Sequence, residues 1–98
     1  MSGSGLPSYT VRLRNRRVRR EMDALRDPDR RRVLAAIRGL AVLPRPVGSE
    51  KLYDAVYRVR VGDWRVIYLV DDKNQRVEVG GIRRRGEQTY KGIDDLFS

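Results

Sequence analysis

Residues 57–69 read Tyr-Arg-Val-Arg-Val-Gly-Asp-Trp-Arg-Val-Ile-Tyr-Leu and hold three arginines where they could bind an anion. Apolar and polar residues alternate on both sides of Gly62-Asp63, as in two half-buried strands joined by a turn. Glycine at the first central position suits a two-residue type II′ turn. In such a hairpin Arg60 faces Arg65, and Arg58 shares their face. Because like charges opposite each other destabilise a sheet, the pattern predicts an anion bound to these arginines.

The other face of the predicted hairpin is apolar, and we expect it to be core. Its residues pair across the turn as Val61 with Trp64, Val59 with Val66 and Tyr57 with Tyr68. The aromatic side chains among them are therefore interpreted as packing residues and not as platforms on which bases stack.

The composition predicts an acidic partner. The 98 residues suffice for one domain with a modest core, and they carry a formal net charge of +9. Only Lys51, Lys73 and Lys91 are lysines among the 22 basic residues, and arginine binds phosphate through paired hydrogen bonds that lysine cannot make. Nucleic acid, an acidic protein or an anionic membrane surface would fit. A GC-rich genome that favours arginine codons is an alternative source of this bias.

The sequence also excludes several kinds of site. It has no cysteine and no histidine, which rules out disulfides, thiolate or imidazole metal sites and histidine acid–base catalysis. No apolar run reaches the length of a membrane span and no secretory signal is present, so we expect a cytoplasmic protein without a membrane partner. Residues 1–7 are interpreted as a flexible leader or cloning scar, and residues 8–98 as a single domain.

Two helices are expected to follow a short strand over 8–13. Asn15 is the predicted N-cap of the first helix. Asp27 and Pro28 are the predicted N-cap and first residue of the second. The apolar stripes at helical spacing are Val18, Met22 and Leu25 in the first helix and Val33, Ile37 and Leu40 in the second.

A short extended segment is expected over 50–53. The hairpin over 55–71 and a strand over 76–83 form the predicted meander. The last strand would pair Tyr68 with Val79 and Val70 with Val77. This register adds four residues to the arginine face, namely Glu78, Gly80, Ile82 and Arg84. A short amphipathic helix carrying Tyr90, Ile93, Leu96 and Phe97 would end the chain.

These elements predict an α+β domain. A strand–helix–helix unit is followed by an antiparallel three-strand meander and a short C-terminal helix, with the helices packed on one sheet face. The arginine face is expected to be open to solvent.

The hairpin and the segment after the last strand resemble the RelE/ParE superfamily of type II toxin–antitoxin toxins. The matching parts are Leu52, residues 57–68 and Arg-Arg-Gly-Glu-Gln-Thr-Tyr over 84–90. Arg-Val-Gly-Asp-Trp-Arg-Val-Ile-Tyr is the specific part, and the element order extends the resemblance to the whole chain after the leader. The segment that ends at Tyr90 is more similar to the RelE branch.

The resemblance implies a ribosome-dependent endoribonuclease that cuts messenger RNA in the ribosomal A site and arrests growth, without a metal or other cofactor. Its implied partners are messenger RNA, ribosomal RNA and a cognate antitoxin that wraps the toxin with a helix or strand. The catalytic residues implied by position are Arg58 and Arg60 on the first hairpin strand, Arg65 on the second, Arg84 after the last strand, and Tyr90.

Metal-free RNA cleavage uses the 2′-hydroxyl as the nucleophile, so the site must neutralise charge on phosphorus and move a proton. Arg65 and Arg84 are the candidates for charge stabilisation, and a solvated face or carboxylate partners such as Glu78 are the alternative. Arg58 and Arg60 stand where RelE-like enzymes often have lysines. Because arginine is effectively always protonated, these two would stabilise charge or only bind the RNA backbone.

Proton transfer is assigned to the segment after the last strand. Tyr90 is the main candidate and Glu87 is a possible general base. The alternatives are packing of Tyr90 at the sheet edge and a dipole-stabilising role for Glu87 at a helix N-terminus. Gly80 either leaves room for a base or marks a bulge.

Arginines outside the hairpin are candidate RNA contacts. Arg16, Arg17 and Arg20 lie on the exterior of the first predicted helix, and Arg85 follows the last strand. Contacts to phosphates would give them affinity without sequence information. An ordinary solvated surface is the alternative.

Two rival functions stay open. The valine-glycine-aspartate-aromatic-arginine stretch also occurs in ParE-like toxins, which poison DNA gyrase and are not nucleases. Because arginines replace lysines, a basic RNA- or protein-binding module without activity is a further alternative.

Overall fold

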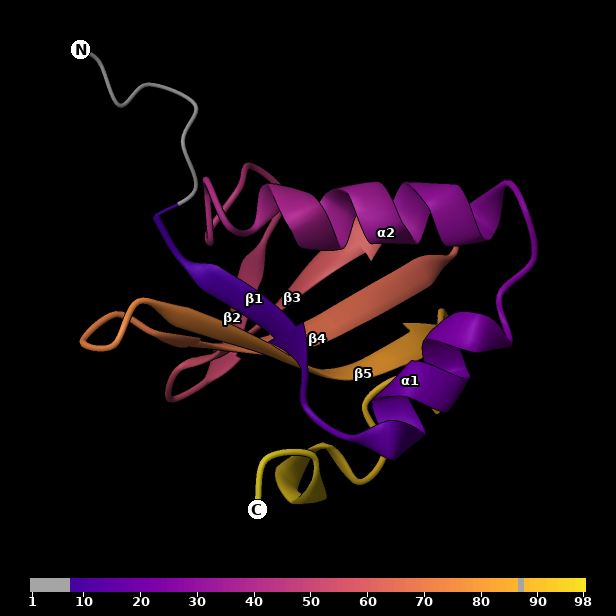
Figure 1. Ribbon diagram of the computed structural model, residues 1–98. Helices are drawn as coiled ribbons and strands as arrows, with labels where there is room; N and C mark the ends of the chain where they lie inside the picture. Colours follow the sequence, from indigo (N-terminus) through magenta and orange to yellow (C-terminus); the bar gives the residue numbers. More distant parts are fainter. Residues whose placement is uncertain (1–7, 87) are drawn as a thin grey trace, which may run out of the picture.

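The computed structural model describes residues 8–86 and 88–98 (Figure 1). The elements are β1 (Thr10–Leu13), α1 (Arg16–Asp23), α2 (Asp29–Gly39), β2 (Glu50–Tyr53), β3 (Val56–Val61), β4 (Trp64–Asp71), β5 (Arg76–Arg84) and the 3-10 turn η1 (Ile93–Asp95). The strands form one sheet in the order β1-β5-β4-β3-β2. The predicted leader over 1–7 and the possible base Glu87 lie outside the described residues.

The predicted α+β class is confirmed, but the sheet differs from the prediction in two ways. It has five strands, because β2 pairs with β3 and extends the expected meander to four antiparallel strands. It is also mixed, because β1 lies at the edge and runs parallel to β5. The predicted C-terminal helix is only the turn η1.

The two helices cover one face of the sheet, as predicted (Figure 1). The Asn15 side chain accepts a hydrogen bond from the backbone N–H of Val18 at 3.2 Å, which confirms the cap of α1. The predicted cap of α2 is wrong, since Pro28 and not Asp27 precedes the helix and no side chain caps it. Both apolar stripes are buried in the main core.

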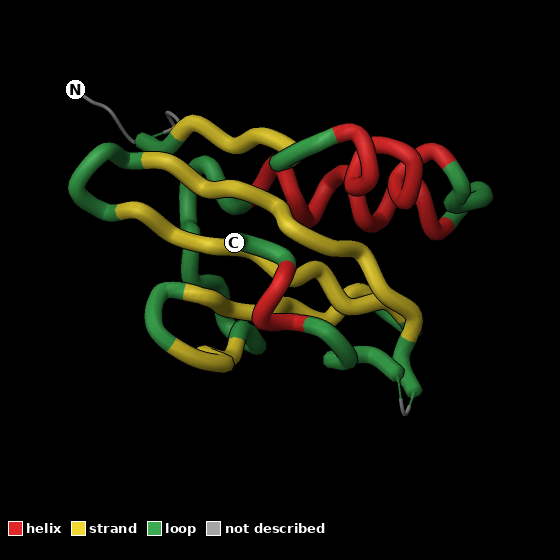
Figure 2. The backbone as a smooth tube through the Cα atoms, turned by 90° about the horizontal axis from the view of Figure 1, so that it is seen from below, coloured by secondary structure: helices red, strands yellow, loops and turns green. Residues whose placement is uncertain are grey.

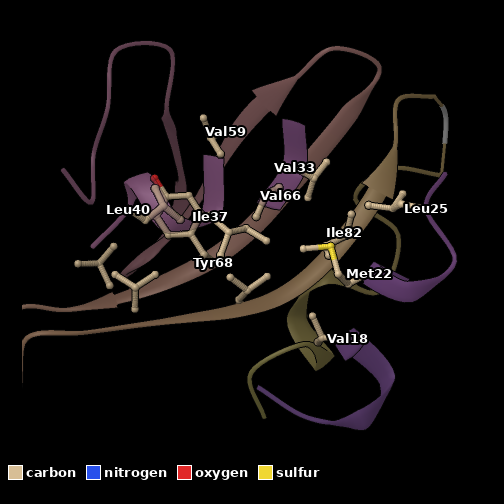
Figure 3. Close-up of a cluster of buried hydrophobic side chains, with 13 residues drawn as sticks. Val18, Met22, Leu25, Val33, Ile37, Leu40, Val59, Val66, Tyr68 and Ile82 are labelled. Carbon is tan, nitrogen blue, oxygen red and sulfur yellow. The ribbon is translucent and has the colours of Figure 1, made fainter. Parts of the chain in front are cut away.

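This main core lies between the helices and the sheet (Figure 3). Tyr68 stands at its centre, and its hydroxyl donates a 2.7 Å hydrogen bond to the carbonyl of Pro44. Burial raises the pKa of Tyr68 to about 12. The predicted apolar face of the hairpin is confirmed, because all six of its residues belong to this core or pack against it.

The hairpin register is also as predicted. Val61 pairs with Trp64 and Arg60 with Arg65 across the turn. Gly62 has a positive φ of 60° and Asp63 does not, which is the backbone pattern of a type II′ turn. The turn therefore follows directly from the glycine at its first central position.

A bulge at Gly80 changes the last strand. Tyr68 pairs with Val79 as expected, but Ile67 pairs with Gly81, so Gly80 is an extra residue in β5. Because one inserted residue reverses the alternation of side chains, the strand beyond it presents the opposite faces. The alternative reading of Gly80 as a bulge is therefore confirmed.

Two side chains of α1 form hydrogen bonds with backbone groups of β5 at the bulge and just after it. Arg17 donates a 2.8 Å hydrogen bond to the carbonyl of Gly80, and Glu21 accepts one of 3.0 Å from the N–H of Ile82. Arg17 and Glu21 also form a salt bridge at 3.0 Å. Since buried backbone polar groups need partners, this pair stabilises the irregularity and attaches α1 to β5.

The second face of the sheet is not open along its whole length, contrary to the prediction. The C-terminal segment crosses it (Figure 2), and Leu96 forms a second cluster there with Val56 and Ile67. Phe97 packs against this cluster, and a Cβ on Gly80 would lie within 3.0 Å of three Phe97 ring carbons. The space left by Gly80 is thus filled by Phe97, so no base could enter there while the tail is in place.

Candidate nucleic-acid interface

Three arginines lie side by side on the second sheet face, at the end of the sheet that carries the Gly62-Asp63 turn. Arg60 of β3 pairs with Arg65 of β4, and Arg65 pairs with Arg83 of β5. We call these three residues the arginine row, and this end of the sheet the hairpin end. Arg83 was missed from the sequence because its place depends on the bulge, and the Gly80-Gly81 pair was the signal that could have identified it.

The guanidinium of Arg65 is held in place by backbone carbonyls. Arg65 is only 9% exposed, and its Nη1 donates hydrogen bonds of 2.9 Å to the carbonyls of Gly62 and Trp64. No buried side-chain nitrogen of the described residues lacks a hydrogen-bond partner. Arg60, next to it, is exposed. The row thus presents the guanidinium of Arg65, which carbonyls hold, beside the exposed residue Arg60.

No member of the arginine row forms a salt bridge with a carboxylate of the described residues. Carbonyl oxygens are dipoles, so they neutralise less of a guanidinium charge than a carboxylate does. Adjacent like charges on a sheet face are destabilising, and a phosphate bound between Arg60 and Arg65 would relieve that repulsion.

Arg84 does not join the row, and its predicted face is wrong. Beyond the bulge it pairs with Trp64 on the helix-covered side, where its guanidinium carbon lies 5.9 Å from the centre of the indole ring. The indole N–H donates a 3.0 Å hydrogen bond to Asp29 of α2. Ile82 is likewise on the helix-covered side, in the main core. Glu78 and Gly80, which precede the reversal, lie on the second face as predicted.

Arg58 shares the face of the row but is engaged elsewhere. It is 5% exposed, and it makes a 2.8 Å salt bridge to Glu50 and a 3.2 Å hydrogen bond to the carbonyl of Gly48. Glu50 is its neighbour on β2, the strand that the sequence did not place in the sheet. Its charge is therefore already paired in the free protein.

The segment after β5 brings Tyr90 to the arginine row. Nη1 of Arg83 donates hydrogen bonds to the carbonyl of Thr89, at 3.2 Å, and to that of Lys91. These two residues flank Tyr90, so the Tyr90 backbone is fixed beside Arg83. The Tyr90 side chain is 40% exposed.

The predicted RNA-contact arginines differ in how free they are. Arg16 and Arg20 of α1 are exposed, whereas Arg17 is bound to Glu21 and Gly80 as described above. Arg85 is exposed at the hairpin end, and its backbone N–H donates a 2.7 Å hydrogen bond to the Asp63 carbonyl. Arg85 is therefore the one of the four that adjoins the row.

A separate groove of about 480 Å³ lies between β1, α1 and α2. Its apolar residues are Val11, Leu13, Met22, Leu34 and Ile37. Four arginines and one carboxylate also line it, namely Arg12, Arg19, Arg30, Arg38 and Asp23. Arg12 is paired with Glu78 and Arg30 with Asp23, so the excess positive charge comes from Arg19 and Arg38. An apolar floor beside excess positive charge suits an amphipathic segment that carries acidic residues.

No three carboxylates of the described residues lie close enough together to hold a metal ion. No helix in the same part of the chain has the length and apolar character that crossing a membrane requires.

Comparison with known proteins identifies the family. The family described as the ParE toxin of type II toxin–antitoxin systems, parDE, matches residues 12–89. This chain belongs to the RelE/ParE toxin superfamily. It is therefore a toxin of a type II toxin–antitoxin system. No curated protein sequence matches the toxin.

Solved RelE structures share the toxin's fold. A chain of the archaeal RelE–RelB complex from Pyrococcus horikoshii is 26% identical with a TM-score of 0.71, over 82% of the toxin and 98% of that chain. One from the RelBE2 toxin–antitoxin complex of Mycobacterium tuberculosis is also 26% identical, with a TM-score of 0.57 over 82% and 100%. The isolated RelE toxin of E. coli, at 17% identity, has a TM-score of 0.68 over 90% and 98%. This last likeness concerns the fold alone.

Proposed function

We propose that the toxin arrests growth by cutting messenger RNA in the ribosomal A site, in the cytoplasm, as an endoribonuclease without a cofactor. The observation that carries this proposal is the arginine row with Tyr90 fixed beside it. Arg60 and Arg65 have no carboxylate partner among the described residues, and Arg83 holds the backbone on both sides of Tyr90. Metal-free cleavage requires at least a phosphate binder and a group that transfers a proton, and Tyr90 would supply the second.

In the proposed reaction the 2′-hydroxyl oxygen attacks the adjacent phosphorus while the bond to the 5′-oxygen breaks. The products are a 2′,3′-cyclic phosphate and a 5′-hydroxyl. Arg60 and Arg65 stabilise the charge that develops on the phosphoryl oxygens, and as arginines they move no proton. Tyr90 relays the proton of the 2′-hydroxyl to the departing 5′-oxygen, which leaves as the 5′-hydroxyl, and Glu87 is the alternative acceptor of the 2′-hydroxyl proton. Arg84, on the other side of the sheet, binds a neighbouring phosphate or the ribosomal RNA.

The antitoxin would hold the toxin inactive by occupying the groove between β1, α1 and α2. One relative is described as a RelE–RelB complex and another as the toxin–antitoxin complex RelBE2. The apolar floor and the excess positive charge of the groove favour an amphipathic, acidic segment of such a partner. Arg16 and Arg20 would contact RNA phosphates on the exposed side of α1.

Inhibition of DNA gyrase is the second candidate function. The matched family is described as the ParE toxin, and Arg58, one of the two implied strand residues, is sequestered by Glu50. In this case the hairpin end would bind its target without cleaving RNA. Nothing in the arginine row itself requires a reaction, because the same guanidinium groups would bind DNA phosphates or acidic side chains.

One experiment separates the two functions. The toxin is induced in cells, transcript 5′ ends are mapped within coding regions, and plasmid supercoiling is measured in the same culture. Endonuclease activity predicts new 5′ ends in codons with unchanged supercoiling. Altered supercoiling without new 5′ ends would support the gyrase alternative and contradict the nuclease.

The variant Tyr90→Phe tests the proposed chemistry. It should slow cleavage on purified ribosomes by about 100-fold, because it removes a general acid–base group, while ribosome binding is retained. Arg76→Gln is the control, since it removes a charge from the opposite end of β5. Full cleavage by Tyr90→Phe would exclude a proton role for the phenol.

A further inference from the structure

We propose that Arg83 is a positioning residue for Tyr90, and that Thr89 assists it. This inference rests on the proposed function, because it assigns Arg83 a role in the same site. Within the arginine row, Nη1 of Arg65 donates to the Gly62-Asp63 turn, whereas Nη1 of Arg83 donates to the C-terminal segment after β5. Its effect on cleavage would therefore pass through Tyr90 and not through direct contact with phosphate.

The first argument is the position of its hydrogen bonds. Both acceptors are backbone carbonyls, of Thr89 and Lys91, and they bracket Tyr90 in the sequence. Charge-assisted hydrogen bonds of this kind are about twice as strong as neutral ones. Arg83 itself is fixed in β5 by its pairing with Arg65. The C-terminal segment is thus tied to β5, next to the β4 strand that carries the proposed phosphate binder Arg65.

The second argument is the loop closed by Thr89. This residue is only 4% exposed, and its hydroxyl lies 2.9 Å from the carbonyl of Arg84 and 2.7 Å from that of Gly86. Its backbone N–H donates to the same Gly86 carbonyl at 3.2 Å. A buried hydroxyl shared by two carbonyls fixes where the chain leaves β5. Thr89 therefore sets the point from which Tyr90 extends.

The third argument is that the tail has a separate anchor. Leu96 is buried in the second cluster, and the Arg14 guanidinium carbon lies 5.6 Å from the centre of the Phe97 ring. Arg14 also donates to the backbone carbonyl of Ser98 at 3.2 Å. Loss of Arg83 should consequently release Tyr90 without detaching the C-terminus. A structural effect and a positioning effect are thereby separable.

The closing experiment is a double-mutant cycle with the full-length toxin on programmed ribosomes. Arg83→Gln should lower kcat about 10- to 100-fold with KM nearly unchanged, since a misplaced reacting group costs rate more than binding. In the Tyr90→Phe background the same change should have little further effect. Thr89→Val should also lower kcat, but by less than Arg83→Gln does. Thr89→Ser keeps the hydroxyl and should have a kcat near that of wild type. Arg76→Gln is the matched control on the same strand.

Amide hydrogen exchange provides a readout that does not depend on cleavage. Arg83→Gln should accelerate exchange at Lys91 and Ile93, and Arg76→Gln should not. If Arg83→Gln accelerates exchange but the wild-type toxin never cuts RNA, the proposed function is overturned. The conclusion that Arg83 holds the backbone on both sides of Tyr90 would still stand. If wild type cleaves, then full activity of Arg83→Gln, or full additivity with Tyr90→Phe, would overturn the positioning role.

Discussion

The two ends of the sheet differ in whether their arginines are paired with carboxylates of the described residues. At the end with the turn between β4 and β5, Arg45 makes a two-pronged contact to Asp72, at 2.7 and 3.2 Å. Tyr9 donates to the same carboxylate at 2.6 Å, and Arg45 also donates to the Tyr57 hydroxyl at 3.0 Å. At the hairpin end, the arginine row has no carboxylate partner among the described residues.

This difference separates arginines that stabilise the fold from arginines that are available to bind a ligand. Arg45 joins the loop after α2 to two other parts of the chain, and its guanidinium carbon lies 5.1 Å from the centre of the Tyr57 ring. Its contacts are complete without a ligand. The arginine row has carbonyl acceptors but no carboxylate partner among the described residues, which is why we propose that an anion binds at that end.

The largest expected effect comes from making the hairpin end resemble the other end. Arg60→Glu places a carboxylate opposite Arg65 and should form a cross-strand ion pair. Cleavage should fall by about 100- to 1,000-fold, since a charge-stabilising donor is replaced by an anion. The free energy of unfolding should stay the same or rise slightly. Ribosome cleavage assays and denaturant unfolding measure the two quantities, with Arg60→Gln as the charge-neutral control.

The next effect concerns the bulge that lies between the two ends. Gly80→Ala should reduce the free energy of unfolding by about 1–3 kcal/mol, because the added methyl would overlap the Phe97 ring. Gly39→Ala is the control, since a Cβ at Gly39 would meet no atom within 4 Å. Urea unfolding of both variants checks this. A cost that persists unchanged in the Phe97→Ala background would contradict the overlap.

A smaller effect is expected at the paired end. Arg45→Ala should lower the free energy of unfolding by about 1 kcal/mol, because it removes an exposed ion pair and a cation–π contact. Cleavage by the variant should match that of wild type. Equal loss of cleavage in Arg45→Ala and Arg60→Glu would remove the distinction between the two ends.

The smallest effect is a pH dependence at the same place. Hydrogen bonds from Arg45, and then from Tyr9, hold the pKa of Asp72 below its ordinary value of 3.8. A carboxyl group with a lowered pKa in the folded state contributes stability above pH 3.8 that is lost as pH falls through the folded value. Acid unfolding followed by circular dichroism should therefore be shallower in Asp72→Asn over that range. An identical acid transition in both proteins would show that Asp72 contributes nothing.

The sequence was sufficient for features with local causes. The hairpin register follows from Gly62 and from strict alternation, and the cap at Asn15 follows from a side chain three residues from its donor. The buried helix stripes follow from spacing alone. Each of these depends on residues that are close in the chain, so periodicity and turn chemistry predict them.

The features that were missed depend on distant partners. The parallel pairing of β1 with β5 joins Thr10 to Arg76, and no local pattern indicates it. The salt bridge of Arg58 required the position of β2. Arg84 was predicted on the arginine face, but Arg83 lies there. The difference is caused by the bulge at Gly80, which the sequence suggested only as an alternative.

The extra residue Gly80 also affects which residue of β5 is assigned a function by comparison with a related sequence. Successive side chains along a strand point to opposite faces of the sheet. The extra residue Gly80 therefore moves every later residue of β5 to the face opposite the one that alternation predicts. Counting from the Gly62-Asp63 turn with strict alternation places Arg84 beside Arg65, whereas the observed strand pairing places Arg83 there. Deleting Gly80 would exchange these neighbours between the two sides of the sheet without altering any charged residue.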